Sequence, residues 1–243
     1  MKTFAKTDIG KARDMNQDYY YVSRPEDEIQ LYIIADGMGG YNGGEIASSL
    51  AVNSIKSYIQ SNYQETPKDK VSLPELIRSS IEYANMVIYE KSKENDDLEG
   101  MGTTIDVCLI YNNRVYIGHV GDSRVYRIRK EFIRRLTTDD SYVQDLIKKG
   151  TISKEEAFSH PKKNMLTKAL GCTPYVEPTI LLKGFQKGDI LLLTSDGLTN
   201  MVKEDKLYEI IKQDIANAVN NLIEEANKQG GYDNITAVVI ENN

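Results

Sequence analysis

The sequence predicts an α+β fold in which helices cover antiparallel sheets. The predicted helices come in sequential pairs, the predicted strands follow one another in runs, and no alternating βαβ unit occurs. This order of elements is typical of layers in which helices are segregated from strands. Two sheets packed face to face, with the helices outside, would accommodate the number of strands. A chain of 243 residues that is 40% apolar can bury a sizeable core, and we expect residues 1–243 to form one domain.

The first half of the chain predicts three strands followed by two helices. The strands cover residues 3–8, 19–23 and 31–35. Apolar residues recur at helical spacing over 44–61, which predicts an amphipathic helix. The next helix is expected to start at Ser72, because Ser72-Leu73-Pro74-Glu75 has the form of a capping box with proline in the first turn.

The second half predicts a hairpin, a polar insertion and a further set of strands and helices. Apolar, β-branched runs at 103–111 and 114–120 are joined by Asn112-Asn113, which suits a tight turn. Residues 139–170 are polar, mostly helical in pattern and contain His160-Pro161, so we expect a surface flap there. The remaining elements are strands at 125–129, 131–136, 176–182, 189–194 and 235–240 and helices at 204–213 and 215–229, the last capped by Asp214.

Charge and composition exclude several classes of protein. A net charge of −6 argues against a nucleic-acid surface, which needs a basic stripe. There is no apolar run of about 18 residues and no apolar signal core at the start, so we expect no membrane insertion. Cys108 and Cys172 lack metal-ligand spacing and are expected to be buried or free thiols in a reducing cytosol. The sequence therefore predicts a cytoplasmic protein.

Two similar phrases end apolar runs in a carboxylate followed by glycine. They are Ile33-Ile34-Ala35-Asp36-Gly37 and Leu193-Thr194-Ser195-Asp196-Gly197. A buried strand delivers each carboxylate, and the glycine, which lacks Cβ, lets the backbone approach whatever the carboxylate holds. The alternative is that both are ordinary exits from a strand into a turn, where Asp-Gly is common.

Further acidic corners favour a metal site over ordinary turns. The carboxylates at strand ends or beside glycines are Asp18, Asp36, Asp122, Asp196 and Asp233. Ligation by oxygen alone selects hard cations, so we expect Mg²⁺ or Mn²⁺ rather than zinc. Two ions about 4 Å apart that share a carboxylate would activate a bridging water for in-line attack. Arg13 could grip a phosphate with its planar fork, or it could be a solvated loop arginine.

Other motifs fail on inspection. Asp14-Met15-Asn16-Gln17-Asp18 opens like a calcium loop, but Tyr19 replaces the required glycine and Pro25 stands where the last acidic ligand belongs. The glycines between Gly37 and Gly44 do not have the dinucleotide spacing. There is no phosphate loop with a terminal Gly-Lys-Ser/Thr, and no Ser, Cys or His constellation for covalent catalysis stands out.

Six motifs in register resemble the metal-dependent Ser/Thr protein phosphatases of type 2C, the PPM family. They are Arg13-x-x-Asn16-x-Asp18, Ala35-Asp36-Gly37-x-Gly39-Gly40, Gly102-Thr103-Thr104, Val120-Gly121-Asp122-Ser123-Arg124, Thr194-Ser195-Asp196-Gly197 and Asp233-Asn234-Ile235-Thr236. His160-Pro161 followed by Leu166-Thr167-Lys168-Ala169-Leu170-Gly171 resembles the bacterial branch. The resemblance spans essentially the whole chain.

The resemblance implies a fold and a set of site residues. The fold would be a four-layer αββα sandwich of two antiparallel sheets, with a flap subdomain, about 139–170, beside a dinuclear site. His160 would belong to the substrate-facing flap. The implied roles are Asp36 bridging two Mn²⁺ or Mg²⁺ ions, the Gly37 carbonyl binding one, Asp196 and Asp233 completing the other, Asp18 acting through metal-bound water, Asp122 with Asp196 holding a third ion, and Arg13 binding the substrate phosphate.

The sequence departs from the family pattern at a few positions. Met38 stands where many eukaryotic members have a histidine general acid, so the leaving group would be protonated by metal-bound water. Gln17 replaces a residue that is acidic in many relatives. His119 and Asp140 stand where bacterial relatives more often carry Asn and His. None of these departures removes a carboxylate that the resemblance assigns to metal.

The leading hypothesis is a phosphatase that hydrolyses phosphoserine and phosphothreonine on proteins by direct attack of a metal-bridging hydroxide. By resemblance, it would oppose a bacterial Ser/Thr kinase and act as a monomer. A non-catalytic phosphoprotein-binding regulator is the first alternative, but such relatives usually lose a metal carboxylate. A phosphatase for small molecules is the second, and it would differ in the flap.

Overall fold

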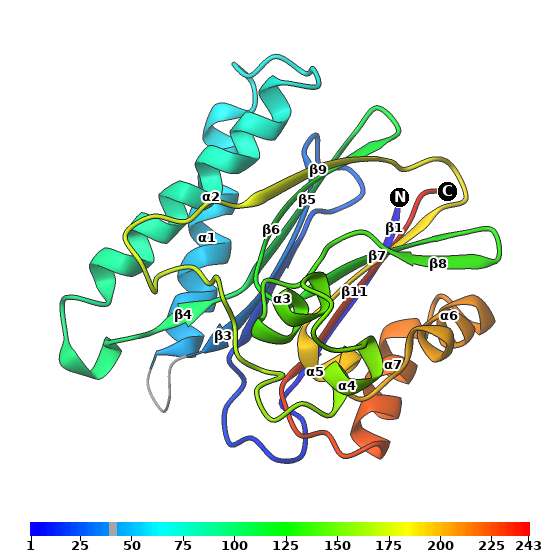
Figure 1. Ribbon diagram of the computed structural model, residues 1–243. Helices are drawn as coiled ribbons and strands as arrows, with labels where there is room; N and C mark the ends of the chain where they lie inside the picture. Colours follow the sequence, from blue (N-terminus) through cyan, green and yellow to red (C-terminus); the bar gives the residue numbers. More distant parts are fainter. Residues whose placement is uncertain (39–42) are drawn as a thin grey trace.

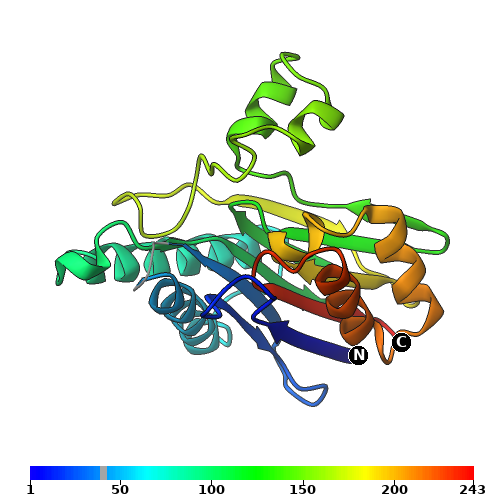
Figure 2. The ribbon, with the colours of Figure 1, turned by 90° about the horizontal axis from the view of Figure 1, so that it is seen from below.

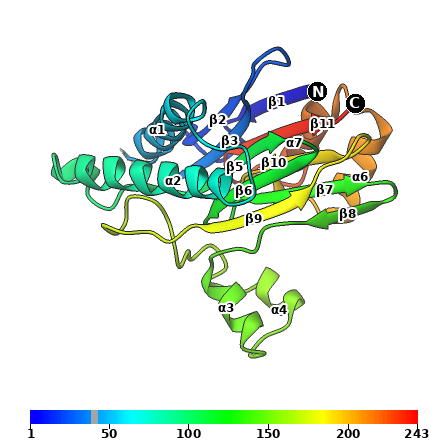
Figure 3. The same ribbon diagram turned by 90° about the horizontal axis from the view of Figure 1, so that it is seen from above.

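The computed structural model describes residues 1–38 and 43–243, so Gly39 and Gly40 of the family motif lie outside the described residues. Two antiparallel sheets pack face to face, and helices cover both outer faces (Figure 1). The predicted four-layer αββα sandwich is therefore confirmed. Helices α3 (Tyr142–Lys148) and α4 (Lys154–Phe158) form a flap that stands away from the sandwich (Figures 2 and 3).

Every strand pairing within the two sheets is antiparallel. The first sheet has the order β1 (Lys2–Asp8), β11 (Ile235–Glu241), β10 (Ile190–Thr194), β7 (Arg124–Arg129), β8 (Phe132–Arg135). The second has the order β2 (Asp18–Val22), β3 (Gln30–Met38), β5 (Ile105–Tyr111), β6 (Arg114–Val120), β9 (Thr179–Gly184), with β4 (Gly102–Thr103) paired to the end of β3. Because β1 pairs with β11, the two termini lie side by side (Figure 3).

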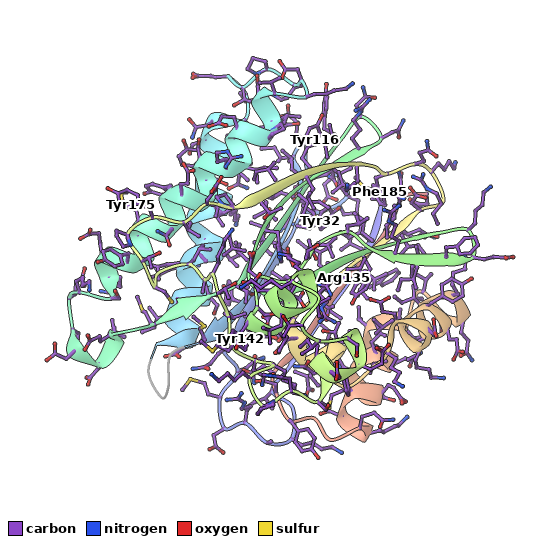
Figure 4. All side chains as sticks on the ribbon, in the orientation of Figure 1. Tyr32, Tyr116, Arg135, Tyr142, Tyr175 and Phe185 are labelled. Atoms are coloured by element: carbon purple, nitrogen blue, oxygen red, sulfur yellow. The ribbon has the colours of Figure 1, made fainter. Side chains whose placement is uncertain are left out.

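Three apolar cores separate the four layers. Helices α1 (Gly44–Asn62) and α2 (Ser72–Lys91) pack on the second sheet through one core. A second core packs α6 (Glu204–Gln213) and α7 (Ala218–Lys228) on the first sheet, together with the short α5 (Asp196–Thr199). The third core fills the space between the sheets and includes Tyr32 and Phe185 (Figure 4). A 3₁₀ turn, Asp96–Leu98, leads from α2 towards β4.

The alternation of side chains along β3 explains where the carboxylates lie. Ile33 and Ala35 point under the helices, whereas Tyr32 and Ile34 point between the sheets. Since side chains alternate along a strand, Asp36 continues the face of Tyr32 and Ile34. The layer between the sheets is therefore apolar in its middle and acidic at one end.

The structure confirms some local predictions and corrects others. Asn112 (φ 48°) and Asn113 (φ 57°) both adopt the left-handed conformation that a two-residue hairpin requires. The predicted capping box at Ser72 is wrong, because Ser72 is already helical and Asp69 accepts hydrogen bonds from the backbone amides of Val71 and Ser72.

The helical parts of the flap and the last helix are shorter than predicted. The flap contains only the two short helices α3 and α4. Helix α7 starts at Ala218 because Asp214 accepts from the amides of Ala216 and Asn217 and holds a turn there. In the described part of the chain, every helix is too short or too polar to cross a membrane. Cys108 is buried, Cys172 is exposed, and both are free.

Candidate metal centre

A pocket of about 600 Å³ opens at the acidic end of the layer between the sheets. It brings together six of the eight residues that the sequence assigned to the site. They are Arg13, Asp36, Gly37, Asp122, Asp196 and Asp233. The other two, Asp18 and His160, do not line the pocket, for different reasons described below.

The backbone of Asp36 is held by a pair of threonines. Its amide donates to Thr104 Oγ1 (3.0 Å), and its carbonyl accepts from the Thr104 amide and from Thr103 Oγ1, both at 2.9 Å. The hydroxyls of Thr104 and Ser123 are 2.7 Å apart, which links Asp36 to the loop that carries Asp122. These contacts fix the position of the Asp36 carboxylate before any ligand binds.

Asp18 lies directly opposite Asp36 in the β2–β3 register and is only 6% exposed. Its Oδ2 accepts from Ser195 Oγ (2.7 Å) and Thr236 Oγ1 (2.6 Å), both from the other sheet. Burial raises the pKa of Asp18 to about 7, although these two hydrogen bonds lower it. Oδ1 is buried without a hydrogen-bond partner among the described residues. A buried oxygen of this kind fits a carboxylate that holds an ordered water.

Asn234 organises the opposite side of the pocket. Its Oδ1 accepts from the Gln17 amide (2.8 Å), and its Nδ2 donates to the carbonyls of Ile9 and Met15, both at 2.9 Å. The loop that carries Arg13 is thereby held beside Asp233. A side chain at Gly197 would place its Cβ 2.0 Å from the Asn234 carbonyl oxygen, so α5 can begin at Asp196 only with glycine next.

The carboxylates of the pocket repel one another. Burial is the main cause that raises the pKa of Asp36 and Asp122 well above their ordinary value, and nearby carboxylates raise both further. Burial and Asp233 raise the pKa of Asp196 to about 6, while Arg124 opposes this. Since like charges in a buried site disfavour ionisation, a divalent cation would relieve the repulsion and keep the group ionised.

The donor set fits Mg²⁺ or Mn²⁺ with water as additional ligands. Among residues 1–38 and 43–243, no three or more His, Cys, Asp or Glu side chains are grouped closely enough to hold a metal ion. Mg²⁺ usually keeps several waters and takes only a few carboxylates, so a partial set of oxygen donors suits it. At Gly37, an added Cβ would lie 2.1 Å from the Gly44 carbonyl oxygen, which shows how closely the backbone segments approach there.

Arg13 contacts one of the carboxylates. Its Nη2 lies 2.7 Å from Asp233 Oδ2, and this hydrogen bond raises the pKa of Arg13. The Arg13 side chain is 50% exposed, so it also reaches solvent at the mouth of the pocket. It therefore holds Asp233 in this structure and stands where an incoming anion would meet it.

The comparison with known proteins identifies the family. The sequence profile described as protein phosphatase 2C matches residues 11–230. The chain belongs to the protein phosphatase 2C family. It is 38% identical over 240 residues to the serine/threonine phosphatase stp of Listeria innocua, covering 98% of this chain and 94% of that protein. The predicted resemblance is confirmed, and the chain is a phosphoprotein phosphatase.

Solved structures of relatives share the fold over their whole length. The Mycobacterium tuberculosis serine/threonine phosphatase PstP/Ppp superimposes with a TM-score of 0.87 at 35% identity, covering 98% of this phosphatase and 97% of that chain. The catalytic domain of PstP in complex with two manganese ions gives a TM-score of 0.85 at 33% identity, covering 98% and 96%. A metal-dependent phosphatase is therefore the established class of this chain.

The flap contributes one wall of the phosphatase pocket, through Asn164 and Leu166. His160 lies elsewhere in the flap. Its Nδ1 accepts from the Lys162 amide (3.1 Å), and its ring lies 6.0 Å from that of Tyr142, which Figure 4 labels. His160 therefore packs within the flap instead of lining the pocket, which does not support its assignment as a substrate-facing residue.

Several residues that organise the site were not given these roles by sequence reasoning. They are Thr104, Ser195, Thr236, Asn234, Asn164 and Leu166. The first four stood inside the quoted family motifs, but the motifs did not say what their side chains contact. Leu166 stood in the quoted bacterial motif and Asn164 stood in none, and the place of both residues at the pocket depends on how the flap folds back.

Proposed function

We propose that this phosphatase hydrolyses phosphoserine and phosphothreonine on proteins at the pocket described above. The observation that supports this most directly is the convergence of Asp36, Asp122, Asp196 and Asp233 with Arg13 around one opening between the sheets. When bound, a pair of Mg²⁺ or Mn²⁺ ions supplies an activated water and a clamp on the phosphoryl oxygens.

The residues of the chain itself have separate roles in holding the ions, a water and the phosphate. Asp36, which lines the pocket, would hold both ions, with the Gly37 carbonyl on one and Asp196 and Asp233 on the other. Asp18 would act through a metal-bound water, which its unpartnered oxygen could hold. The guanidinium of Arg13 reaches solvent, and it binds two phosphate oxygens while remaining beside Asp233.

The choice of metal and the number of ions belong to the same proposal. We assign Mn²⁺ or Mg²⁺ to the two core positions, supported by the oxygen-only donor set and by the manganese-containing PstP structure. A third ion would bind between Asp122 and Asp196; burial and then the nearby Asp196 carboxylate raise the pKa of Asp122 well above its ordinary value.

The leaving group must receive a proton from water. Met38 lines the pocket and has no proton to donate, and none of the described lining residues is a histidine. Water within the pocket is the remaining donor. This assignment agrees with the expectation from the sequence that Met38 replaces a general acid.

The biological setting that we propose follows from the family. Residues 1–243 act as one catalytic domain, with the flap over about 139–170 beside the pocket. The substrates include a Ser/Thr kinase, and the phosphatase acts as a monomer in the cytoplasm.

One experiment tests the reaction and the substrate class together. Hydrolysis of a phosphothreonine peptide, a phosphotyrosine peptide and a small aryl phosphate is measured with and without Mn²⁺. We expect Mn²⁺-dependent turnover that favours the phosphothreonine peptide over the phosphotyrosine peptide. Turnover of the aryl phosphate with none of the phosphothreonine peptide would favour a small-molecule phosphatase, and turnover without metal would exclude the proposed chemistry.

A further inference from the structure

A buried ionisable pair lies in the same layer as the carboxylates, but the proposed chemistry does not use it. Asp106 on β5 and His119 on β6 face each other in the strand register. Both side chains are completely buried, and His119 Nδ1 lies 2.7 Å from Asp106 Oδ1. Asp106 Oδ2 has no hydrogen-bond partner among the described residues, so this carboxyl group serves His119 alone.

The second contact of His119 determines where its protons are. Its Nε2 lies 3.0 Å from the carbonyl oxygen of Thr138. A carbonyl oxygen can only accept, so Nε2 carries a hydrogen and donates it. Nδ1 and Asp106 Oδ1 then share one proton. Burial raises the pKa of Asp106 to about 6, and Asp106 raises the pKa of His119 although burial opposes this.

Thr138 belongs to the segment where the chain leaves the sandwich for the flap. The next residue, Asp139, accepts from Arg124 Nε (3.1 Å) and Nη2 (2.7 Å) and also pairs with Arg135, which Figure 4 labels. Two arginines and one histidine therefore hold two successive residues of this segment.

The same segment contacts the loop that carries Asp122. The Asp140 amide donates to the Gly121 carbonyl (2.7 Å), and the Gly121 amide donates to Asp140 Oδ2 (3.3 Å). Asp122 follows directly in the chain and lines the pocket. We call the reciprocal contact of Gly121 and Asp140 the flap clasp. The position of Asp122 thus depends on residues 138–140, which His119 holds through the Thr138 carbonyl.

We propose that Asp106 and His119 are positioning residues that keep the flap clasp closed and so place Asp122 at the pocket. Asp106 holds the imidazole ring of His119 in place, His119 donates from Nε2 to the Thr138 carbonyl, and residues 138–140 then hold Gly121. The part of the inference that concerns metal rests on the proposed function, because it takes Asp122 to be a ligand. The part that concerns the clasp does not.

A matched pair of variants separates this role from simple packing. In Asp106→Asn, the amide can donate to Nδ1, so His119 keeps its donor to Thr138 and the clasp should remain as in the wild type. In Asp106→Ala, Nδ1 loses its partner and a cavity opens beside it, so the imidazole ring is free to rotate and its hold on Thr138 is weakened.

The first readout is amide hydrogen exchange in the metal-free protein. We expect the Gly121 and Asp140 amides to exchange at least about tenfold faster in Asp106→Ala than in the wild type, the range typical for loss of one to two hydrogen bonds. The second readout is the Mn²⁺ concentration that gives half-maximal activity. It should rise about 10-fold or more in Asp106→Ala, because outer partners that orient ligands typically contribute 10–100-fold. Asp106→Asn should match the wild type in both measurements.

Ile117→Ala serves as the packing control. Ile117 lies two residues before His119 on β6, is fully buried in the core between the sheets, and its truncation opens a cavity without removing a polar contact. Faster exchange at Gly121 and Asp140 in Asp106→Ala but not in Ile117→Ala supports the proposal. Unchanged exchange in Asp106→Ala, or equal acceleration in Ile117→Ala, overturns it.

Two further arrangements keep the test decisive. Should Asp106→Ala not fold, the double variant Asp106→Leu with His119→Leu replaces the pair with apolar side chains, which is often tolerated, and still removes the donor to Thr138. If the wild type shows no Mn²⁺-dependent hydrolysis, the proposed function fails while the exchange measurement continues to test the clasp. If every variant has normal activity and unchanged amide exchange, the positioning role of Asp106 and His119 is rejected while the proposed function stands.

Discussion

The floor and the flap wall of the pocket are built differently. The floor consists of the pocket carboxylates Asp36, Asp122, Asp196 and Asp233, which come from distant parts of the chain. Buried hydrogen bonds, such as those between Thr104 and Asp36, fix the backbone beneath them. The wall comes from one segment, which leaves the sandwich near Thr138 and returns where the Leu170 amide donates to the Thr103 carbonyl (2.9 Å). Figures 2 and 3 show how far α3 and α4 stand from the sheets. On the basis of this difference, we propose that the floor performs the chemistry and that the flap selects the substrate.

The largest effect is expected from the floor. Asp36→Asn should lower kcat/KM by more than about 100-fold with every substrate, because it removes the charge of a proposed metal ligand rather than a group that only orients one. Activity is measured across a Mn²⁺ titration, with circular dichroism to confirm folding. Asp14→Asn is the matched control, since Asp14 lines the same pocket but is exposed, and it should retain most activity. Equal losses in the two variants would contradict the metal assignment.

Arg13 stands between the floor and solvent, and its removal should have the second largest effect. Arg13→Ala should raise KM about 10–100-fold with a smaller change in kcat, because a charge-assisted hydrogen bond contributes roughly 1.5–3 kcal/mol to binding the phosphate in the ground state. Steady-state kinetics with a phosphothreonine peptide and an aryl phosphate measure this. Arg13→Lys keeps the charge but loses the planar fork, so its KM should lie between that of the wild type and that of Arg13→Ala. A lower kcat with unchanged KM would instead assign Arg13 to the transition state.

A change in the flap should affect peptides only. Asn164→Ala removes one polar side chain from the pocket wall and should raise KM for a phosphothreonine peptide about 2–10-fold, the range for one hydrogen bond. Hydrolysis of an aryl phosphate should not change. Met165→Ala, an exposed neighbour outside the pocket lining, is the control and should leave both substrates unaffected. If Asn164→Ala lowers aryl phosphate hydrolysis as well, the division between floor and wall is wrong.

The smallest effect concerns the pair beneath the flap and its dependence on pH. Asp106 raises the pKa of His119 in the folded protein, so the stability that this contact contributes is fully present below the ordinary imidazole pKa of about 6.5 and is lost as pH rises through the folded pKa. The difference in Tm between the wild type and Asp106→Asn, measured without metal, should therefore shrink from about pH 6 to about pH 9. Asp139, Asp140 and Arg135 also affect how stability depends on pH, but they are present in both proteins, so their contributions cancel in the difference in Tm. A difference that grows with pH would contradict the shift.

The sequence predicted the floor well and the wall poorly, for a physical reason. Strands and paired helices follow from apolar periodicity, and Asp36 and Asp196 stand out because a buried run ends in a carboxylate and glycine. The flap is polar, its helices are short, and contacts to distant segments decide where Asn164 lies. His160 lies in the flap as predicted, but its ring packs against Tyr142 of the same flap, a contact that the sequence does not show.

Asp106 was within reach of sequence reasoning and was overlooked. It is the only charged residue in the predicted strand 103–111, and the two-residue turn at Asn112-Asn113 fixes the hairpin register. Counting back from that turn pairs Asp106 with His119, as the structure shows. The position of Thr138 above them could not be counted in this way, because it depends on how β8 leads into the flap.

Asp18 and Asp36 are directly paired across strands β2 and β3, and this pairing limits where the chain can gain or lose residues during evolution. One amino acid inserted into β3 before Asp36 would turn that carboxylate towards α1 and present an aliphatic side chain to the phosphate instead. The same insertion in the turn near Asp27 would leave both acids in place. Natural length variants of this enzyme should therefore differ in that turn or in the flap, and keep the number of residues in β3 constant.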